Sequence, residues 1–153
     1  MRPLIDLVFR TRRLALRLLR LKTCGVKVLL VNRANEILLI RNSYGRSDLW
    51  VLPGGGVGRR ETPERAARRE VKEELGLDVP LLAFVSAHYS RSEGKSDTIH
   101  LFTGEAPGEA EPDGVEVEEA AFFAPDALPD NVSPATLRRI SEHLGRRRPD
   151  GSW

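Results

Sequence analysis

The feature that most constrains the fold is the run from residue 55 to residue 77, GGVGRRETPERAARREVKEELGL. It joins a glycine turn, a helix start, several spaced glutamates and a helix stop. Thr62 can cap a helix, Pro63 suits the first helical position, and Gly76 suits the left-handed residue just past the end. These signals predict a helix over residues 63–75 that follows directly on a tight turn.

The predicted helix has an acidic face that packing does not explain. Glu70, Glu73 and Glu74 stand at positions i, i+3 and i+4, so their carboxylates project from one side. Ala67, Val71 and Leu75 form the apolar stripe beside them, and Arg65, Arg68 and Lys72 lie on the far side. Clustered carboxylates repel one another, and a bound Mg²⁺ or Mn²⁺ reverses that repulsion. We therefore expect a metal site, with a solvated face balanced by Arg69 and Lys72 as the alternative.

The spacing of the defined residues resembles the Nudix box. Its positions are filled by Gly55, Glu61, Arg69, Glu70, Val71, Glu73, Glu74, Gly76 and Leu77. The resemblance extends more loosely over residues 26–144. It implies the Nudix fold, an α/β/α sandwich around a mixed central sheet. It also implies a pyrophosphohydrolase, an enzyme in which water attacks a phosphorus of a nucleoside diphosphate linked to another group.

The resemblance also implies roles for the acidic residues. The expected metal ligands are Glu70, Glu74, Glu73, the Gly55 carbonyl, Glu61 and a late-loop glutamate, for which Glu116 is the first choice and Glu118 and Glu119 are alternatives. Glu70 and Glu73 remain competing candidates for the general base, and Arg69 is expected to orient a glutamate through an ion pair. The implied cofactor is Mg²⁺, with Mn²⁺ as a substitute.

Residues outside the box are candidates for substrate binding. Arg41, Arg46 and Arg91 can hold phosphates, and Tyr89 can stack on a nucleobase, although each is also an ordinary surface residue type. Trp50 stands in an apolar strand and is expected in the core. His88 and His100 are expected to be structural.

The remaining chain predicts strands and a closing helix. Strands are expected over residues 26–32, 36–42, 49–53, 81–89, 98–103 and 120–123, a polar loop over 91–97, an acidic loop over 104–119 and a last helix over 133–144. The resulting organisation is a basic amphipathic helix in residues 1–24, one α/β domain in residues 25–145, and a flexible tail in residues 146–153.

The first 22 residues differ in charge from the rest of the chain. They carry seven bases against Asp6, whereas the whole chain has a net charge of +2. Leucines at three-to-four spacing in residues 3–22 predict an amphipathic helix broken too often by arginine to span a membrane. Packing on the domain or on a dimer partner ranks first, an anionic membrane surface second and a cleaved import sequence third. We expect no specific nucleic-acid binding by the domain.

Composition adds little beyond the compartment. The single cysteine, Cys24, excludes an internal disulfide framework and indicates a reducing, cytoplasmic setting. The leading function is Mg²⁺-dependent hydrolysis of a small nucleotide, either a nucleoside triphosphate or a nucleotide-sugar or ADP-ribose type substrate. The alternatives are a noncatalytic nucleotide-sensing domain and a membrane-surface hydrolase of a lipid-linked pyrophosphate.

Overall fold

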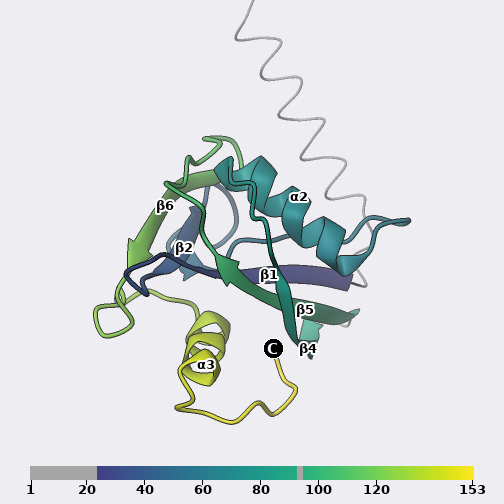
Figure 1. Cartoon of the computed structure of the whole chain (residues 1–153). Helices are drawn as coiled ribbons and strands as arrows, with labels where there is room; N and C mark the ends of the chain where they lie inside the picture. The colour runs from purple at the N-terminus through teal and green to yellow at the C-terminus, as the bar shows by residue number, and fades with distance from the viewer. Residues whose placement is uncertain (1–23, 93–94) are drawn as a thin grey trace, which may run out of the picture.

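The computed structural model describes residues 24–92 and 95–153. The expected N-terminal helix lies outside the described residues. The elements in chain order are β1 (Cys24–Val31), β2 (Ile37–Asn42), β3 (Trp50–Val51), α2 (Pro63–Leu75), β4 (Ala83–Ser92), β5 (Lys95–Glu105), β6 (Val117–Phe123) and α3 (Pro134–His143). Figure 1 shows α2 and α3 on opposite sides of one sheet. The expected sandwich with a mixed sheet is confirmed, since β1 and β5 run parallel and the other pairs are antiparallel.

The central strands are buried on both faces, which is why a helix lies on each side. Residues Ile37 to Ile40 of β2 are fully buried, and alternate residues join different cores. Leu38 and Ile40 pack with Val71 and Leu75 of α2, whereas Ile37 and Leu39 pack with Ile140 of α3. The two apolar layers hold the sheet between α2 and α3.

The helix that carries the box has the predicted limits. The Thr62 hydroxyl accepts a hydrogen bond from the Arg65 amide, and Gly76 adopts φ 69° while its amide donates to the Lys72 carbonyl. Both ends are therefore fixed by local chemistry that the sequence already displays.

The glycine turn is held in a gap between two strands. β1 and β2 pair only at Val31 and Ile37, where their hairpin closes. Beyond that point the chain after β3 runs beside β1, and the Val28 and Val26 amides donate to the carbonyls of Pro53 and Gly55 at 3.0 and 2.9 Å. Long-range pairing with β1 thus positions the turn that leads into α2.

Two expectations about loops are corrected by strand pairing. The polar loop expected over residues 91–97 is instead the end of a hairpin, because β4 extends to Ser92 and β5 begins at Lys95. The acidic stretch 104–119 begins within β5 and ends within β6. In both places cross-strand hydrogen bonds extend strands into polar sequence that carries no local strand signal.

Residues 146–153, expected to form a flexible tail, include residues that contact the domain. The Tyr89 amide donates to the Gly151 carbonyl, and the Trp153 amide donates to the Tyr89 carbonyl. Arg139, which is fully buried on α3, donates to the Ser152 carbonyl at 2.7 Å and lies 5.3 Å from the Trp153 ring centre. The tail therefore packs along the outer edge of β4.

Candidate active site

The glutamates of α2 gather around one arginine. Arg69 donates to both carboxylate oxygens of Glu61, at 2.8 and 2.9 Å, and to Glu70 at 2.8 Å. It also lies 3.5 Å from Glu73 and donates to the Gly56 carbonyl at 2.9 Å. Paired carboxylates, Glu61 foremost, raise the pKa of the guanidinium, so Arg69 stays charged at all working pH values.

The glycine turn closes over the two most buried carboxylates. Glu70 is fully buried and Glu74 is 2% exposed. The Gly54 amide donates to Glu74 at 3.0 Å, and a Cβ atom on Gly55 would lie 2.5 Å from the Glu70 carboxyl carbon. Gly54 has φ 143° and its backbone passes so near the Val26 carbonyl that no side chain fits. The turn needs glycines because it lies directly against β1 and the helix glutamates.

Glu61 fixes the segment between the turn and the helix. Besides its pair with Arg69, it accepts a hydrogen bond from the Gly58 amide at 2.8 Å. Glu61 stands just before Thr62, and its partner Arg69 lies eight residues later on α2, so Glu61 links the loop before the helix to the helix itself. Glu61 thus joins the cluster through Arg69 and the loop backbone.

The late acidic loop meets the C-terminal end of α2. The Asp113 amide donates to the Glu74 carbonyl at 3.1 Å, and an Asp113 carboxylate oxygen accepts from the amides of residues 115–117. Of the three late glutamates, Glu116 is 3% exposed, whereas Glu118 and Glu119 are exposed. The hydrogen bonds that Asp113 makes with the loop backbone, and the burial of the Glu116 side chain, favour Glu116 over the other two as the late-loop candidate. The organising role of Asp113 was missed, although its position before Gly114 is a common turn signal.

The structure does not bring the expected substrate residues to the glutamates as a group. Arg41 pairs with Glu119 and lies over the Trp50 ring at 5.5 Å, while Arg46 pairs with Asp48 in an exposed loop. Tyr89 is 70% exposed on β4, two strands away from β1. The Arg91 side chain lies outside the described part of the structure. Trp50 is 7% exposed, so its expected core position is confirmed.

The chemistry of the glutamate cluster fits a hard divalent cation. Glu70, Glu74, Glu73 and Glu61 offer carboxylate oxygens, and Gly55 offers a carbonyl that already accepts the Val26 amide. Within residues 24–92 and 95–153, no group of three or more acidic, histidine or cysteine side chains is placed so that it could hold a metal ion by itself. Mg²⁺ usually takes only one or two protein carboxylates and completes its shell with water and phosphate oxygens.

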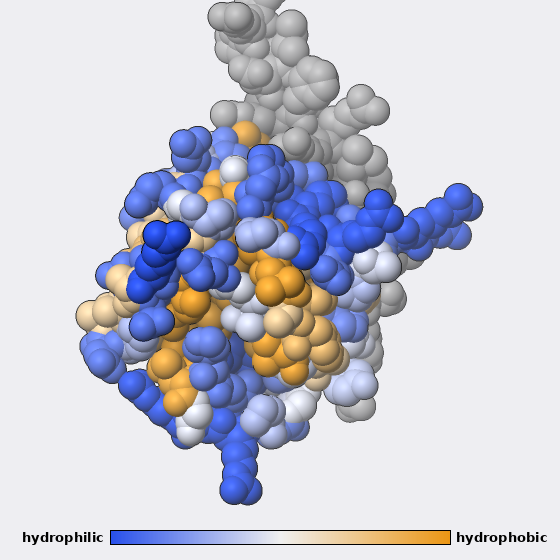
Figure 2. Space-filling view, viewed as in Figure 1, coloured by the Kyte–Doolittle hydropathy of each residue, from blue (hydrophilic) through white to orange (hydrophobic). Residues whose placement is uncertain are grey.

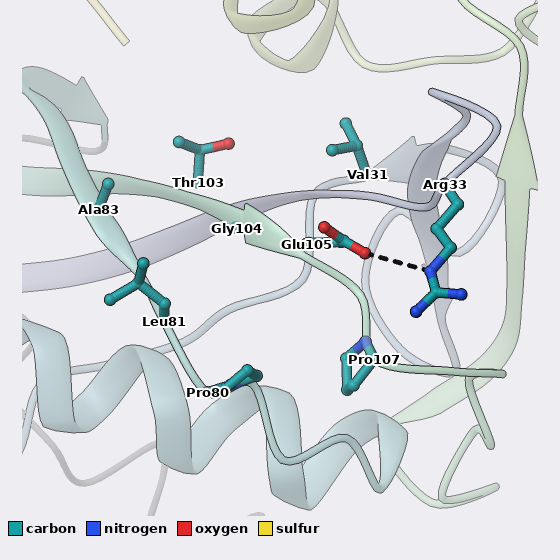
Figure 3. Close-up of a pocket in the computed structure, with 9 residues that line it drawn as sticks. All are labelled: Val31, Arg33, Pro80, Leu81, Ala83, Thr103, Gly104, Glu105 and Pro107. Carbon is teal, nitrogen blue, oxygen red and sulfur yellow. Dashed lines mark ion pairs between the residues drawn. The ribbon is translucent and has the colours of Figure 1, made fainter.

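A separate pocket lies at the other end of β1. It has a volume of about 570 Å³ and is lined by Val31, Arg33, Pro80, Leu81, Ala83, Thr103, Gly104, Glu105 and Pro107. Figure 3 shows Arg33 and Glu105 paired across its rim, at 3.6 Å. Its lining contains no residue of the box, so this pocket is separate from the glutamate cluster.

Fold and site together define a mixed α/β domain that presents a carboxylate-rich helix for phosphate chemistry. The NUDIX domain model matches residues 22–144 of the chain. The chain belongs to the Nudix family and is a Nudix hydrolase. Among the described residues, no helix is long and apolar enough to cross a membrane.

Individual relatives agree with this assignment. The chain is 37% identical over 123 residues to a Bacillus subtilis (strain 168) protein named "Putative 8-oxo-dGTP diphosphatase", covering 78% of each chain. It is 33% identical to "Putative ADP-ribose pyrophosphatase YjhB" of the same organism, covering 78% of this chain and 60% of that protein. A solved MutT NUDIX hydrolase from Burkholderia pseudomallei superposes with a TM-score of 0.71 at 27% identity, covering 78% of this chain and 96% of the other.

Proposed function

We propose that this protein is a Mg²⁺-dependent pyrophosphohydrolase that cleaves a nucleoside triphosphate. The observation that carries the proposal is the way Arg69 gathers Glu61, Glu70 and Glu73 beside a glycine turn that also contacts Glu74. Paired carboxylates on one turn of a helix serve metal-assisted phosphoryl chemistry better than they serve packing. A nucleoside triphosphate ranks first because the Bacillus subtilis relative at 37% identity is named for 8-oxo-dGTP.

The metal would be held by Glu70 and Glu74, and the Gly55 carbonyl, Glu61, Glu116 and Glu73 are candidates for any further position in its shell. When bound, Mg²⁺ neutralises charge on the phosphate oxygens. The residues of the chain itself must hold the carboxylates in position for the metal. Arg69 does this for Glu70, and the Gly54 amide does it for Glu74, through the short contacts described above.

In the reaction, a water oxygen forms a bond to phosphorus while the bridging phosphorus–oxygen bond breaks, and a carboxylate takes the proton from water. Glu73 is favoured as that base over Glu70. Its side chain is 34% exposed and lies 3.5 Å from Arg69, whereas Glu70 is fully buried and 2.8 Å from the same arginine. A base must meet solvent water, which reaches the partly exposed Glu73 side chain more readily than the buried Glu70 side chain.

ADP-ribose is the second candidate substrate, supported by the relative at 33% identity that is named for it. A release assay separates the two candidates and tests the function itself. The purified chain is incubated with a panel that contains the common and oxidised nucleoside triphosphates, ADP-ribose and nucleotide sugars, each with Mg²⁺, Mn²⁺ or EDTA.

We expect pyrophosphate release from a triphosphate with either metal and none with EDTA. Preferred cleavage of ADP-ribose would replace the first substrate class by the second. A chain that binds these nucleotides but turns over none of them, at any metal concentration, would contradict the enzymatic proposal and leave the sensing alternative.

A further inference from the structure

One part of the sheet has no helix over it within the described residues. α2 packs on β1 and β2 through the core that contains Val26, Val28 and Phe102. Farther out on the same face lie Phe84, Ala87, Tyr89, Thr98 and His100, a set called here the uncovered face. Figure 2 shows hydrophobic surface gathered below α2, over the part of the sheet that carries β4 and β5.

Two aromatic side chains of this face are exposed to solvent. Phe84 is 58% exposed and Tyr89 is 70% exposed, although both stand on a strand next to the sheet interior. Phe84 packs edge-on against Phe102 at 5.7 Å, so its ring extends the buried core outward to the surface. Exposed aromatic rings that continue a buried core favour packing of another element at this place.

The chain itself supplies a segment of matching length and position. Cys24 stands on the same face as Thr98 and Tyr89, because the three occupy one register across β1, β5 and β4. Residues 3–22 end just before Cys24, and a helix of that length measures about 30 Å. The ten residues of β4 extend about 33 Å. The segment therefore enters at one end of the uncovered face and can reach the other.

The hydrophobic pattern of the segment also matches an apolar docking surface. Leucines recur at three-to-four spacing, which gives one apolar stripe. They are Leu4, Leu7, Leu14, Leu18 and Leu21.

We propose that residues 3–22 form an amphipathic helix that packs on the uncovered face of the same chain, beside α2. The helix runs antiparallel to β1, with Leu18 and Leu21 near Tyr89 and with Leu4 and Leu7 toward Phe84. The C-terminal tail already hydrogen-bonds to the backbone of Tyr89 at the outer edge of β4, so strand addition by a second copy is blocked there. The face, rather than the edge, is the docking surface.

Photo-crosslinking of the full chain tests this placement. Benzoylphenylalanine is introduced at Phe84 in one variant and at Tyr89 in another, and ¹⁴N and ¹⁵N chains are mixed before irradiation. Positions 84 and 89 are five strand residues apart, and an α-helix needs about 11 residues to cover the same distance. We expect crosslinks within one chain, from position 89 to residues near Leu18 and from position 84 to residues near Leu7.

A matched control uses Leu137, which is 40% exposed on α3, on the opposite side of the sheet. The same probe at that position should give no crosslink to residues 3–22. Crosslinks between ¹⁴N and ¹⁵N chains would overturn the proposal in favour of a second copy. Absence of crosslinks would overturn the proposal. Loss of the crosslinks on addition of phosphatidylserine vesicles that bind the chain would overturn it in favour of a membrane surface.

A second measurement does not depend on the crosslinking probe. The double substitution Leu14→Glu and Leu18→Glu should raise hydrogen exchange in residues 3–22 and increase binding of a hydrophobic dye, while the domain stays folded. The control double substitution Arg13→Glu and Arg17→Glu, on the basic side, should change neither the hydrogen exchange of residues 3–22 nor the dye binding. Equal behaviour of the two double variants would refute packing through the leucine stripe.

Discussion

Replacing Gly55 by alanine tests the site most sharply, because the three heavy atoms nearest to the added methyl group all belong to the Glu70 carboxylate. Its Cβ would lie 2.5 Å from the carboxyl carbon of Glu70 and 2.5 and 2.7 Å from the two oxygens. Ordinary contacts between such atoms are about 3.5 Å, so the carboxylate must move by about 1 Å. The backbone of Gly55 does not have a positive φ, so alanine adds no conformational strain.

The expected consequences for stability and activity differ in size. Glu70 ends a flexible side chain, so the fold should lose only about 1 kcal/mol, at the low end for overpacking. Glu70 is fully buried and held by Arg69 at 2.8 Å, however, so its displacement disturbs the metal ligands together. A misplacement of about 1 Å costs on the order of 100-fold in rate.

The assay compares kcat at saturating Mg²⁺ with the thermal unfolding midpoint for Gly55→Ala and a matched control. Gly25→Ala is that control, because its Cβ would lie at an ordinary 3.4 Å from the Gly55 carbonyl oxygen. We expect a large fall in kcat for Gly55→Ala alone. Wild-type kcat in that variant would refute the view that the Glu70 carboxylate position limits the chemistry. Unfolding of both variants would show that neither the turn nor the adjoining start of β1 tolerates a side chain.

Three further predictions address the charged groups. Glu74→Gln keeps an oxygen that can accept a hydrogen bond from the Gly54 amide, so this variant should fold normally. Its Mg²⁺-dependent hydrolysis in the release assay should fall more than 100-fold, and wild-type activity would remove Glu74 from the ligand set. Arg69→Lys cannot reproduce the fork that holds Glu61 and should lower kcat about tenfold or more, with unchanged kcat counting against an orienting role. Burial and the nearby Arg139 lower the pKa of His88 below 6.5, so the unfolded state binds the extra proton. Stability is therefore complete above pH 6.5 and falls as the pH drops below it, and calorimetry should find this slope reduced in His88→Gln.

The sequence by itself determined the catalytic helix and its class of chemistry. Thr62 and Gly76 act within one turn of the helix ends, so local chemistry was enough to fix residues 63–75. The acidic face followed from helical spacing alone. Arg69 was expected to orient a glutamate, and the structure places it against Glu61, Glu70 and Glu73 at once.

The tertiary structure decided what lies around that helix, because those contacts join residues far apart in the chain. Three features depend on strand neighbours that no local pattern encodes. They are the pairing of the glycine turn with β1, the burial of Glu116 but not of Glu118 or Glu119, and the packing of the tail against Tyr89. An arginine on α3 would ordinarily be expected at the surface, yet Arg139 is fully buried beside His88. Local periodicity specifies a helix and its faces, whereas only the assembled sheet decides which faces meet.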